Sequence, residues 1–223
     1  MQKPIDLFFK LLEFLVVVAL VAMPVGALVY GSLRTSAPGL PGEWTLEKYA
    51  GLLSPGVLGV MAQTLVIGVA TAVFSVVLGT AIALIVHRTD FRLPNLATAL
   101  IGLAFYFPSF ILAMAWIIIG SPGGLINYVW GTLLGLPGKL DIYTIPGIVF
   151  VMVLHQVPFV YLTMRGPIIG MDSLFEEAAR TAGATPGQVL RRITLPLLGY
   201  SIVSSAILTF ISSIEQFAIP SGK

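Results

Sequence analysis

The sequence predicts an all-α fold: a polytopic bundle of transmembrane helices that carries a pair of short cytoplasmic helices. The first observation is composition, since 57% of the 223 residues are hydrophobic and 10% are charged, with a mean hydropathy of +0.98. Soluble domains carry about 25% charged residues, so this chain cannot build a water-facing surface. The second observation is a series of apolar segments of membrane-spanning length, and the third is one patterned polar segment at 173–196.

The residue types present exclude several kinds of site. The chain has no cysteine, which excludes disulfides and thiolate metal sites. Its two histidines, His87 and His155, are far apart in the sequence, so we expect no metal site. There is no Gly-rich phosphate loop followed by Lys and no pair of carboxylates near a His. We therefore expect no catalytic residue, no cofactor and no enzymatic activity in this chain, and nothing in it suggests a nucleic-acid partner.

The first element is a transmembrane helix rather than a signal peptide. Lys3 and Lys10 precede an apolar run that continues to about Leu33, well beyond the ~7–15 residues of a signal-peptide core. Pro24 lies inside this run, and neighbouring helices in a bundle can satisfy the carbonyl that it frees.

Five segments are long and apolar enough to span a membrane, which needs ~20 such residues. The second is overlong, so we expect it to tilt or to begin in the interface. We interpret 1–223 as one transmembrane domain. The five predicted spans are 11–33, 57–86, 96–119, 142–164 and 197–217.

The distribution of Lys and Arg predicts a cytoplasmic N-terminus, because cytoplasmic loops carry an excess of these residues. With that orientation eight fall inside and three outside, and Lys223 is left at the chain end. The inside set is Lys3, Lys10, Arg88, Arg92, Arg165, Arg180, Arg191 and Arg192, and the outside set is Arg34, Lys48 and Lys139. The polar segment 165–196 is then cytoplasmic.

The second span carries small residues at steps of three or four, which place them on one helical face. In lipid such a stripe lets helix backbones approach closely. We favour a packing role for it over a pore-lining role. The stripe is Gly68, Ala72, Ser75, Gly79 and Ala83.

The segment 173–196 predicts two short helices joined by a bend. Ser173 followed by Glu176 has the spacing of a capping box. Gly183 suits the left-handed position just past a helix end. Thr185, Pro186 and Gln188 then form a second helix start. The residues alone leave three interpretations open: a protein-docking site, an amphipathic pair lying on lipid, or an ordinary cytoplasmic loop.

The same segment resembles the EAA signature of inner-membrane permease subunits of binding-protein-dependent ABC importers. The signature is Glu-Ala-Ala, three residues, Gly, nine residues, Ile, one residue and Leu-Pro. Every position matches, at Glu177, Ala178, Ala179, Gly183, Ile193, Leu195 and Pro196. The resemblance implies that 173–196 is a coupling loop that sits in a cleft of a cytoplasmic ATPase. It implies an anchoring role for Glu177, close packing at the two alanines and a bend at Gly183. Arg180 is a docking contact or a positive-inside anchor.

The rest of the chain is compatible with that family over nearly its whole length. The segment "QTL" at 63–65, which opens a small-residue span ending in "HRTDF" at 87–91, resembles the core entry of these permeases. The Arg-Thr-Asp at 88–90 resembles especially the iron(III)-type and the related polyamine- or thiamine-type members, and "GGLINYVWG" at 123–131 resembles the same branch. Such permeases have about six spans, and no further span follows Phe217 here. We therefore expect a fragment or a product truncated at the C-terminus.

The resemblance implies a permease of the bacterial inner membrane that does no bond chemistry itself. Its implied partners are a dimeric cytoplasmic ABC ATPase, a second permease copy or half, an extracytoplasmic solute-binding protein and membrane lipid. Iron(III) is the favoured cargo, with polyamine, thiamine, sulfate and sugar as alternatives. A secondary transporter or channel, and a membrane scaffold without transport activity, are the alternatives from other classes.

His155 and Gln156 are the candidate pathway residues, because polar groups in the middle of a span are often functional. The alternative, which we favour, is a hydrogen bond between helices near Pro158.

Overall fold

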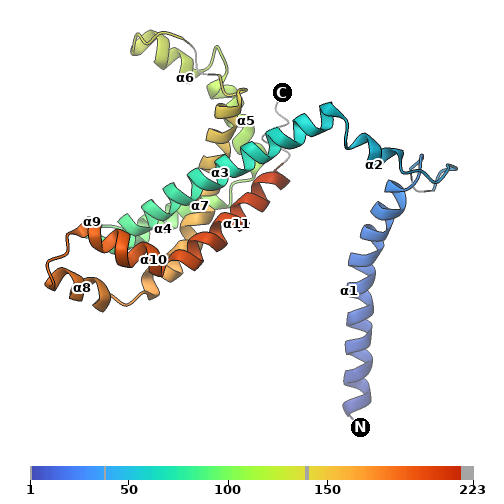
Figure 1. Cartoon of the computed structure of the whole chain (residues 1–223), viewed down its shortest axis with the longest axis horizontal. Coiled ribbons are helices and arrows are strands. Elements are labelled where there is room, and N and C mark those ends of the chain that lie inside the picture. Colours follow the sequence, from blue (N-terminus) through green and yellow to red (C-terminus); the bar gives the residue numbers. More distant parts are fainter. Residues whose placement is uncertain (1, 38, 139–140, 217–223) are drawn as a thin grey trace. The chain divides into compact units, whose positions relative to one another are not determined.

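The computed structural model describes residues 2–37, 39–138 and 141–216, and the side chains from residue 9 onwards within those ranges. The chain forms two compact units, 1–62 and 63–223, which are described separately below. The described residues are predominantly helical (Figure 1). In chain order the helices are α1 Gln2–Ser32, α2 Glu47–Gly51, α3 Pro55–Arg88, α4 Pro94–Phe105, α5 Ser109–Gly120, α6 Leu125–Tyr128, the π-helix η1 Val129–Leu133, α7 Ile145–Gly170, α8 Leu174–Thr181, α9 Pro186–Val189, the π-helix η2 Leu190–Thr194, α10 Leu195–Leu197 and α11 Gly199–Glu215.

The first unit contains α1, α2 and the start of α3. Helix α1 continues through Pro24, as predicted. After it, Arg34 pairs with Trp44 in an isolated antiparallel bridge, and the Arg34 guanidinium lies 5.3 Å from the ring centre of Tyr30 and 5.5 Å from that of Trp44. Lys48 Nζ donates to the carbonyl of Gly31 at 2.9 Å. These contacts fold the connection between α1 and α2 back onto the end of α1.

The membrane-spanning lengths confirm most of the predicted spans. Among the described residues, four helical stretches are long and apolar enough to cross a membrane: Phe9–Ser32, Pro55–Arg88, Ser109–Leu133 and Ile145–Gly170. A fifth candidate is a bent pair, Pro186–Leu197 followed by Gly199–Glu215, with 66° between the two parts.

The predicted continuous span at 96–119 is wrong. This segment forms two helices, α4 and α5, which are separated at Tyr106, Phe107 and Pro108. Pro108 cannot donate a backbone hydrogen bond, and it disfavours a helical conformation in the residue before it. Its own ψ of 132° is extended. The apolar stretch that begins at Ser109 instead continues through α6 and η1, where we predicted an outward loop.

The core of the second unit lies between α3, α7 and the start of α11. Its buried side chains are Val76, Ala83, Val86, Val160, Tyr161, Met164, Ile168 and Leu198. The small-residue stripe of α3 makes this approach close, as predicted, because all five of its residues are buried. A Cβ built at Gly79 would lie 2.7 Å from Cβ of Val160, and one at Gly68 would lie 3.2 Å from the ring of Phe210.

Tyr161 joins three helices near one end of this core. Its side chain is fully buried. The hydroxyl lies 3.0 Å from Nε2 of His87 on α3 and 2.7 Å from Oγ1 of Thr98 on α4. A buried hydroxyl needs such partners, so this cluster fixes α3 and α4 against α7 near the C-terminal end of α3.

Candidate functional site

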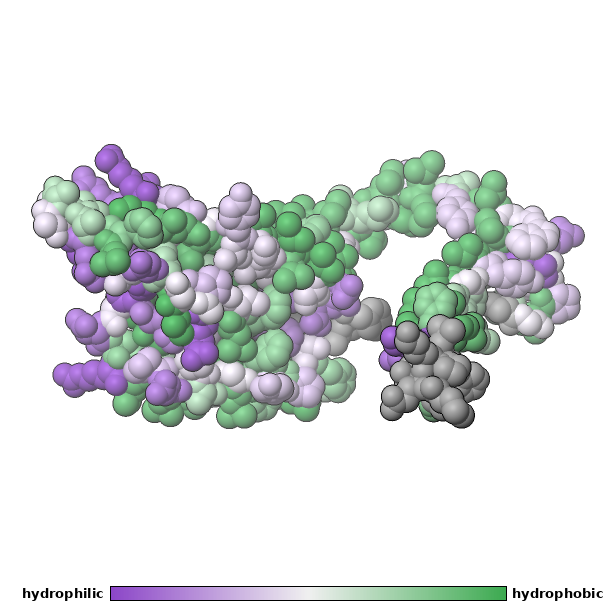
Figure 2. Space-filling model, turned by 90° about the horizontal axis from the view of Figure 1, so that it is seen from below, coloured by the Kyte–Doolittle hydropathy of each residue, from purple (hydrophilic) through white to green (hydrophobic). Residues whose placement is uncertain are grey.

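The short helices at 173–196 form a bend at one end of the second unit. We call residues 173–196 the elbow. Helices α8, α9 and α10 lie at this end and α6 lies at the other (Figure 1). Within this unit, hydrophilic surface is most concentrated at the end that carries the elbow (Figure 2). The exposed charged residues Glu177, Arg180, Arg191 and Arg192 belong to it.

Gly183 terminates α8 in the left-handed conformation that the sequence predicts. Its φ is +86°. Its N–H donates to the carbonyl of Arg180 at 2.9 Å, and the N–H of Ala184 donates to that of Ala179 at 2.9 Å. This pair of bonds is a Schellman motif, which satisfies the last carbonyls of a helix. Since L side chains rarely adopt such a φ, the direction of the chain between α8 and α9 depends on this glycine.

The second predicted capping box is present. Thr185 Oγ1 accepts from the N–H of Gln188 at 3.4 Å, and Gln188 Oε1 accepts from the N–H of Thr185 at 2.8 Å. Pro186 occupies the first turn, where its missing N–H leaves no bond unmade. Helix α9 therefore begins at a position that its own residues determine.

The first predicted capping box is wrong. Ser173 has helical backbone angles and its side chain makes no capping hydrogen bond. Asp172 Oδ1 instead accepts from the N–H of Leu174 at 3.0 Å. The carboxylate of Glu176 is turned inward, where it accepts from Oγ1 of Thr194 at 2.7 Å. The Glu176 carboxylate therefore binds Thr194, 18 residues further along the chain, instead of capping the start of α8.

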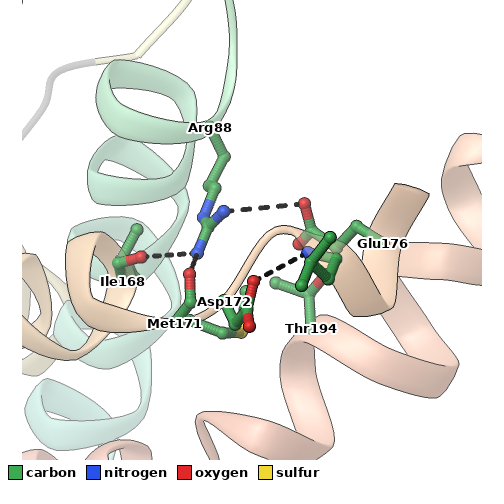
Figure 3. Close-up of polar contacts among 7 residues, drawn as sticks. Arg88, Ile168, Met171, Asp172, Glu176 and Thr194 are labelled. Carbon is green, nitrogen blue, oxygen red and sulfur yellow. Dashed lines mark hydrogen bonds and ion pairs between the residues drawn. The ribbon is translucent and has the colours of Figure 1, made fainter. Parts of the chain in front are cut away.

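That buried carboxylate also faces an arginine from α3 (Figure 3). Arg88 Nη1 lies 3.8 Å from Glu176 Oε2, and Arg88 Nη2 donates to the carbonyls of Ile168 and Met171 at 2.7 and 2.6 Å. Both charged side chains are largely buried, with exposed fractions of 17% and 11%. The guanidinium thus lies at the C-terminal end of α7, where the helix dipole favours a positive charge.

Sequence reasoning missed the functional interest of Glu176 and Thr194, and treated Arg88 as one of the cytoplasmic charges. One signal was available. Adjacent residues on a helix project about 100° apart, so a helix that packs on one side can bury Glu176 while it exposes Glu177.

The residues of the EAA pattern are divided between the surface and the inside of the bend. Glu177, Ala178, Gly183 and Pro196 are exposed, while Ala179, Ile193 and Leu195 are partly buried. A hollow of about 320 Å³ opens between α8 and α9–η2. It is lined by Ala179, Ala182, Gly183, Ala184, Gln188, Val189, Arg192 and Ile193. The fold therefore brings Ala179, Gly183 and Ile193 together at one small concave surface.

The candidate pathway residues lie elsewhere, in the middle of α7. His155 is partly buried. Gln156 is buried, and its Nε2 donates to Oγ of Ser212 on α11 at 2.8 Å. This bond is the contact between helices that the alternative interpretation of Gln156 predicts. It leaves a pathway role for either residue as a prediction.

A sequence profile described as "Binding-protein-dependent transport system inner membrane component" matches residues 75–222, more than half of the chain. The chain is 29% identical over 195 residues to a probable molybdenum ABC transporter permease protein of Haloferax volcanii, which covers 87% of this chain. It is also 29% identical over 164 residues to a sulfate transport system permease protein of Salmonella typhimurium, which covers 74%.

The fold is similar to that of a solved transporter. A chain of a bacterial ABC transporter involved in the import of the acidic polysaccharide alginate superimposes with a TM-score of 0.75 at 16% identity, covering 98% of this chain and 80% of that chain. The two relatives by sequence are longer than the region matched here. The match spans 65% of the Haloferax protein and 58% of the Salmonella protein.

Proposed function

The chain belongs to the family of binding-protein-dependent transport system inner membrane components, and from this membership we infer that it is the membrane-spanning permease subunit of an ABC importer. In this proposal a separate cytoplasmic ATPase dimer hydrolyses ATP, and an external binding protein delivers the solute. A second permease copy or half completes the translocation pathway. The N-terminus is cytoplasmic, as the Lys and Arg distribution predicts.

The observation that carries the proposal is the elbow with its exposed motif residues. Two short helices have their relative direction fixed by a left-handed glycine and by a capping box, and they present Glu177, Ala178 and Arg180 to solvent. A stiff helix pair that contacts both a motor and a bundle can carry rigid-body motion between them. A secondary transporter or channel has no use for such a pair, because it needs no contact with an ATPase.

For the cargo we propose an inorganic oxyanion in place of iron(III). The two relatives reported above are named for molybdenum and for sulfate. In neutral solution molybdenum(VI) and sulfur(VI) are the tetrahedral oxyanions molybdate and sulfate, so a single recognition chemistry covers both names. The test measures uptake by vesicles that hold the assembled importer. It compares the uptake of labelled sulfate and molybdate with that of labelled iron(III). Uptake of iron(III) alone would restore the first expectation.

Removal of the elbow is expected to abolish binding of the ATPase. A variant lacking residues 173–196, and a second in which Glu177→Lys and Arg180→Glu reverse the exposed charges of α8, should both lose co-purification with the cognate ATPase. Arg92→Glu is the matched control, because Arg92 is exposed outside the elbow. The coupling assignment is wrong if both elbow variants retain the ATPase at the level of the unmodified chain.

A further inference from the structure

Arg88 connects three elements that meet at the polar end of the second unit. It is the last residue of α3, its Nη2 holds two carbonyls at the end of α7, and its Nη1 faces Glu176 on α8. Glu176 in turn accepts a hydrogen bond from Thr194 at the end of η2. The Arg88 side chain therefore joins the end of α3 to the end of α7 (Figure 3). Through the carboxylate of Glu176 it is also linked to α8 and to η2, the two sides of the elbow.

The two glutamates of α8 have different surroundings. Glu176 is buried and faces Arg88 and Thr194, whereas Glu177 is exposed. In a helix pair that contacts a motor on one side and a bundle on the other, these surroundings assign a side to each residue. Glu177 lies on the surface available to a partner, and Glu176 lies on the surface that contacts the bundle.

Apolar packing between α3 and the elbow is incomplete, which makes the polar contact more important. A cavity of about 340 Å³ lies between them, with Leu84 and Ile85 on the α3 side and Val189 and Leu190 on the elbow side. Arg88, Glu176 and Thr194 also line this cavity. The ion pair of Arg88 with Glu176 joins α3 to α8 across this cavity.

We propose that Arg88 is a positioning residue that transmits movement of the elbow to the ends of α3 and α7 by way of Glu176 and Thr194. The elbow is joined covalently to α7 through residues 171–172 and to α11 through residues 197–198, and Arg88 and Glu176 connect it to α3. Without this contact, the ATPase can move the elbow while α3 stays behind. The proposal rests on the proposed function, because it needs an ATPase that moves the elbow.

The test uses the full importer in proteoliposomes, with its ATPase and binding protein, and measures cargo taken up per ATP hydrolysed. Arg88→Met is expected to lower this ratio about tenfold or more, while co-purification of the ATPase stays within twofold. Glu176→Gln keeps the shape of the side chain and removes its charge, and it should lower the ratio in the same direction. Arg92→Met is the control, since Arg92 is an exposed arginine in the loop that follows α3.

A combined variant separates transmission from simple stabilisation. If Arg88 acts through Glu176, Arg88→Met with Glu176→Gln lowers the ratio no further than Arg88→Met alone. Thermal unfolding is measured beside it, because a structural role alone lowers the melting temperature and leaves the ratio unchanged. If Arg88→Met fails to insert, Glu176→Gln decides by itself.

The outcomes distinguish this proposal from the one on which it rests. An unmodified chain that binds no ATPase refutes both. If the unmodified chain couples normally and Arg88→Met or Glu176→Gln gives the same uptake per ATP, the role of Arg88 is refuted and the proposed function is not. Independent, multiplying effects of the two substitutions refute transmission through Glu176.

Discussion

Gly183→Val is expected to uncouple ATP hydrolysis from uptake while the subunit still inserts and still folds its bundle. Gly183 has a φ of +86°, a conformation in which a β-branched residue is strongly disfavoured. Holding a non-glycine residue there costs about 1–3 kcal/mol, and the two Schellman hydrogen bonds are lost if the backbone relaxes. Since 1.4 kcal/mol is about tenfold in an equilibrium constant, the native direction of α8 relative to α9 becomes about tenfold less populated relative to relaxed conformations. We expect uptake per ATP to fall about tenfold.

The elbow itself supplies a matched control. Gly187 lies four residues further on, in α9, and a Cβ built there meets nothing within 4 Å. Gly187→Val adds the same side chain without the left-handed conformation, so it should preserve coupling. Gly183→Asn should retain much of it, because Asn tolerates the left-handed region better than other residues. Wild-type uptake per ATP by the Gly183→Val subunit would remove the basis for this role of the bend.

Gly79→Leu is expected to destabilise the bundle more than any substitution in the elbow. A Cβ at this position would lie 2.7 Å from Cβ and Cγ1 of Val160 and 3.1 Å from the carbonyl oxygen of Val157. Val160 is fully buried, so it has no free direction in which to move. Overpacking a core costs about 1–3 kcal/mol, and we expect Leu at the upper end of that range. The measurement is thermal unfolding of the purified subunit in detergent.

A series at two glycines distinguishes this clash from a general effect of size. Gly79→Ala should also lower the midpoint, by less than Leu, because the first added carbon already collides with Val160. Gly102 lies on α4, where an added Cβ meets nothing within 4 Å. Gly102→Ala and Gly102→Leu should leave the midpoint unchanged or raise it, since glycine is a poor helix former. An equal effect at the two positions would argue against close packing of α3 on α7.

The features that the sequence predicted well are those with a local cause. Long apolar runs predicted α1, α3 and α7, and the conformation of Gly183 and the box at Thr185 follow from residues within a few positions of each. The break before α5 was missed because an average over ~20 apolar residues does not register one proline. The true cause, Pro108, was visible in the sequence and was outweighed by the hydrophobicity around it.

The cluster around Arg88 could not be predicted in the same way. Glu176 lies three positions after Ser173, where it can act locally as a capping residue. The residues near it in the sequence do not indicate that Arg88, 88 residues earlier, will lie beside it. The choice between the two uses depends on how α3 and α7 end in space. It is decided by tertiary packing, which overrides a local preference worth about 1 kcal/mol.

The bend before α11 has a mechanical consequence. Leu198 lies at the 66° break, is 2% exposed and belongs to the buried core. It can therefore serve as a fixed point about which the bent helix pair rotates. On one side of it lies the short arm of the elbow, and on the other the 17 residues of α11, a rod of about 25 Å. A rotation of about 10° about this point would carry the far tip of the rod by about 4 Å. In the proposed importer, a small stroke of the elbow would thereby become a larger displacement at the far end of α11.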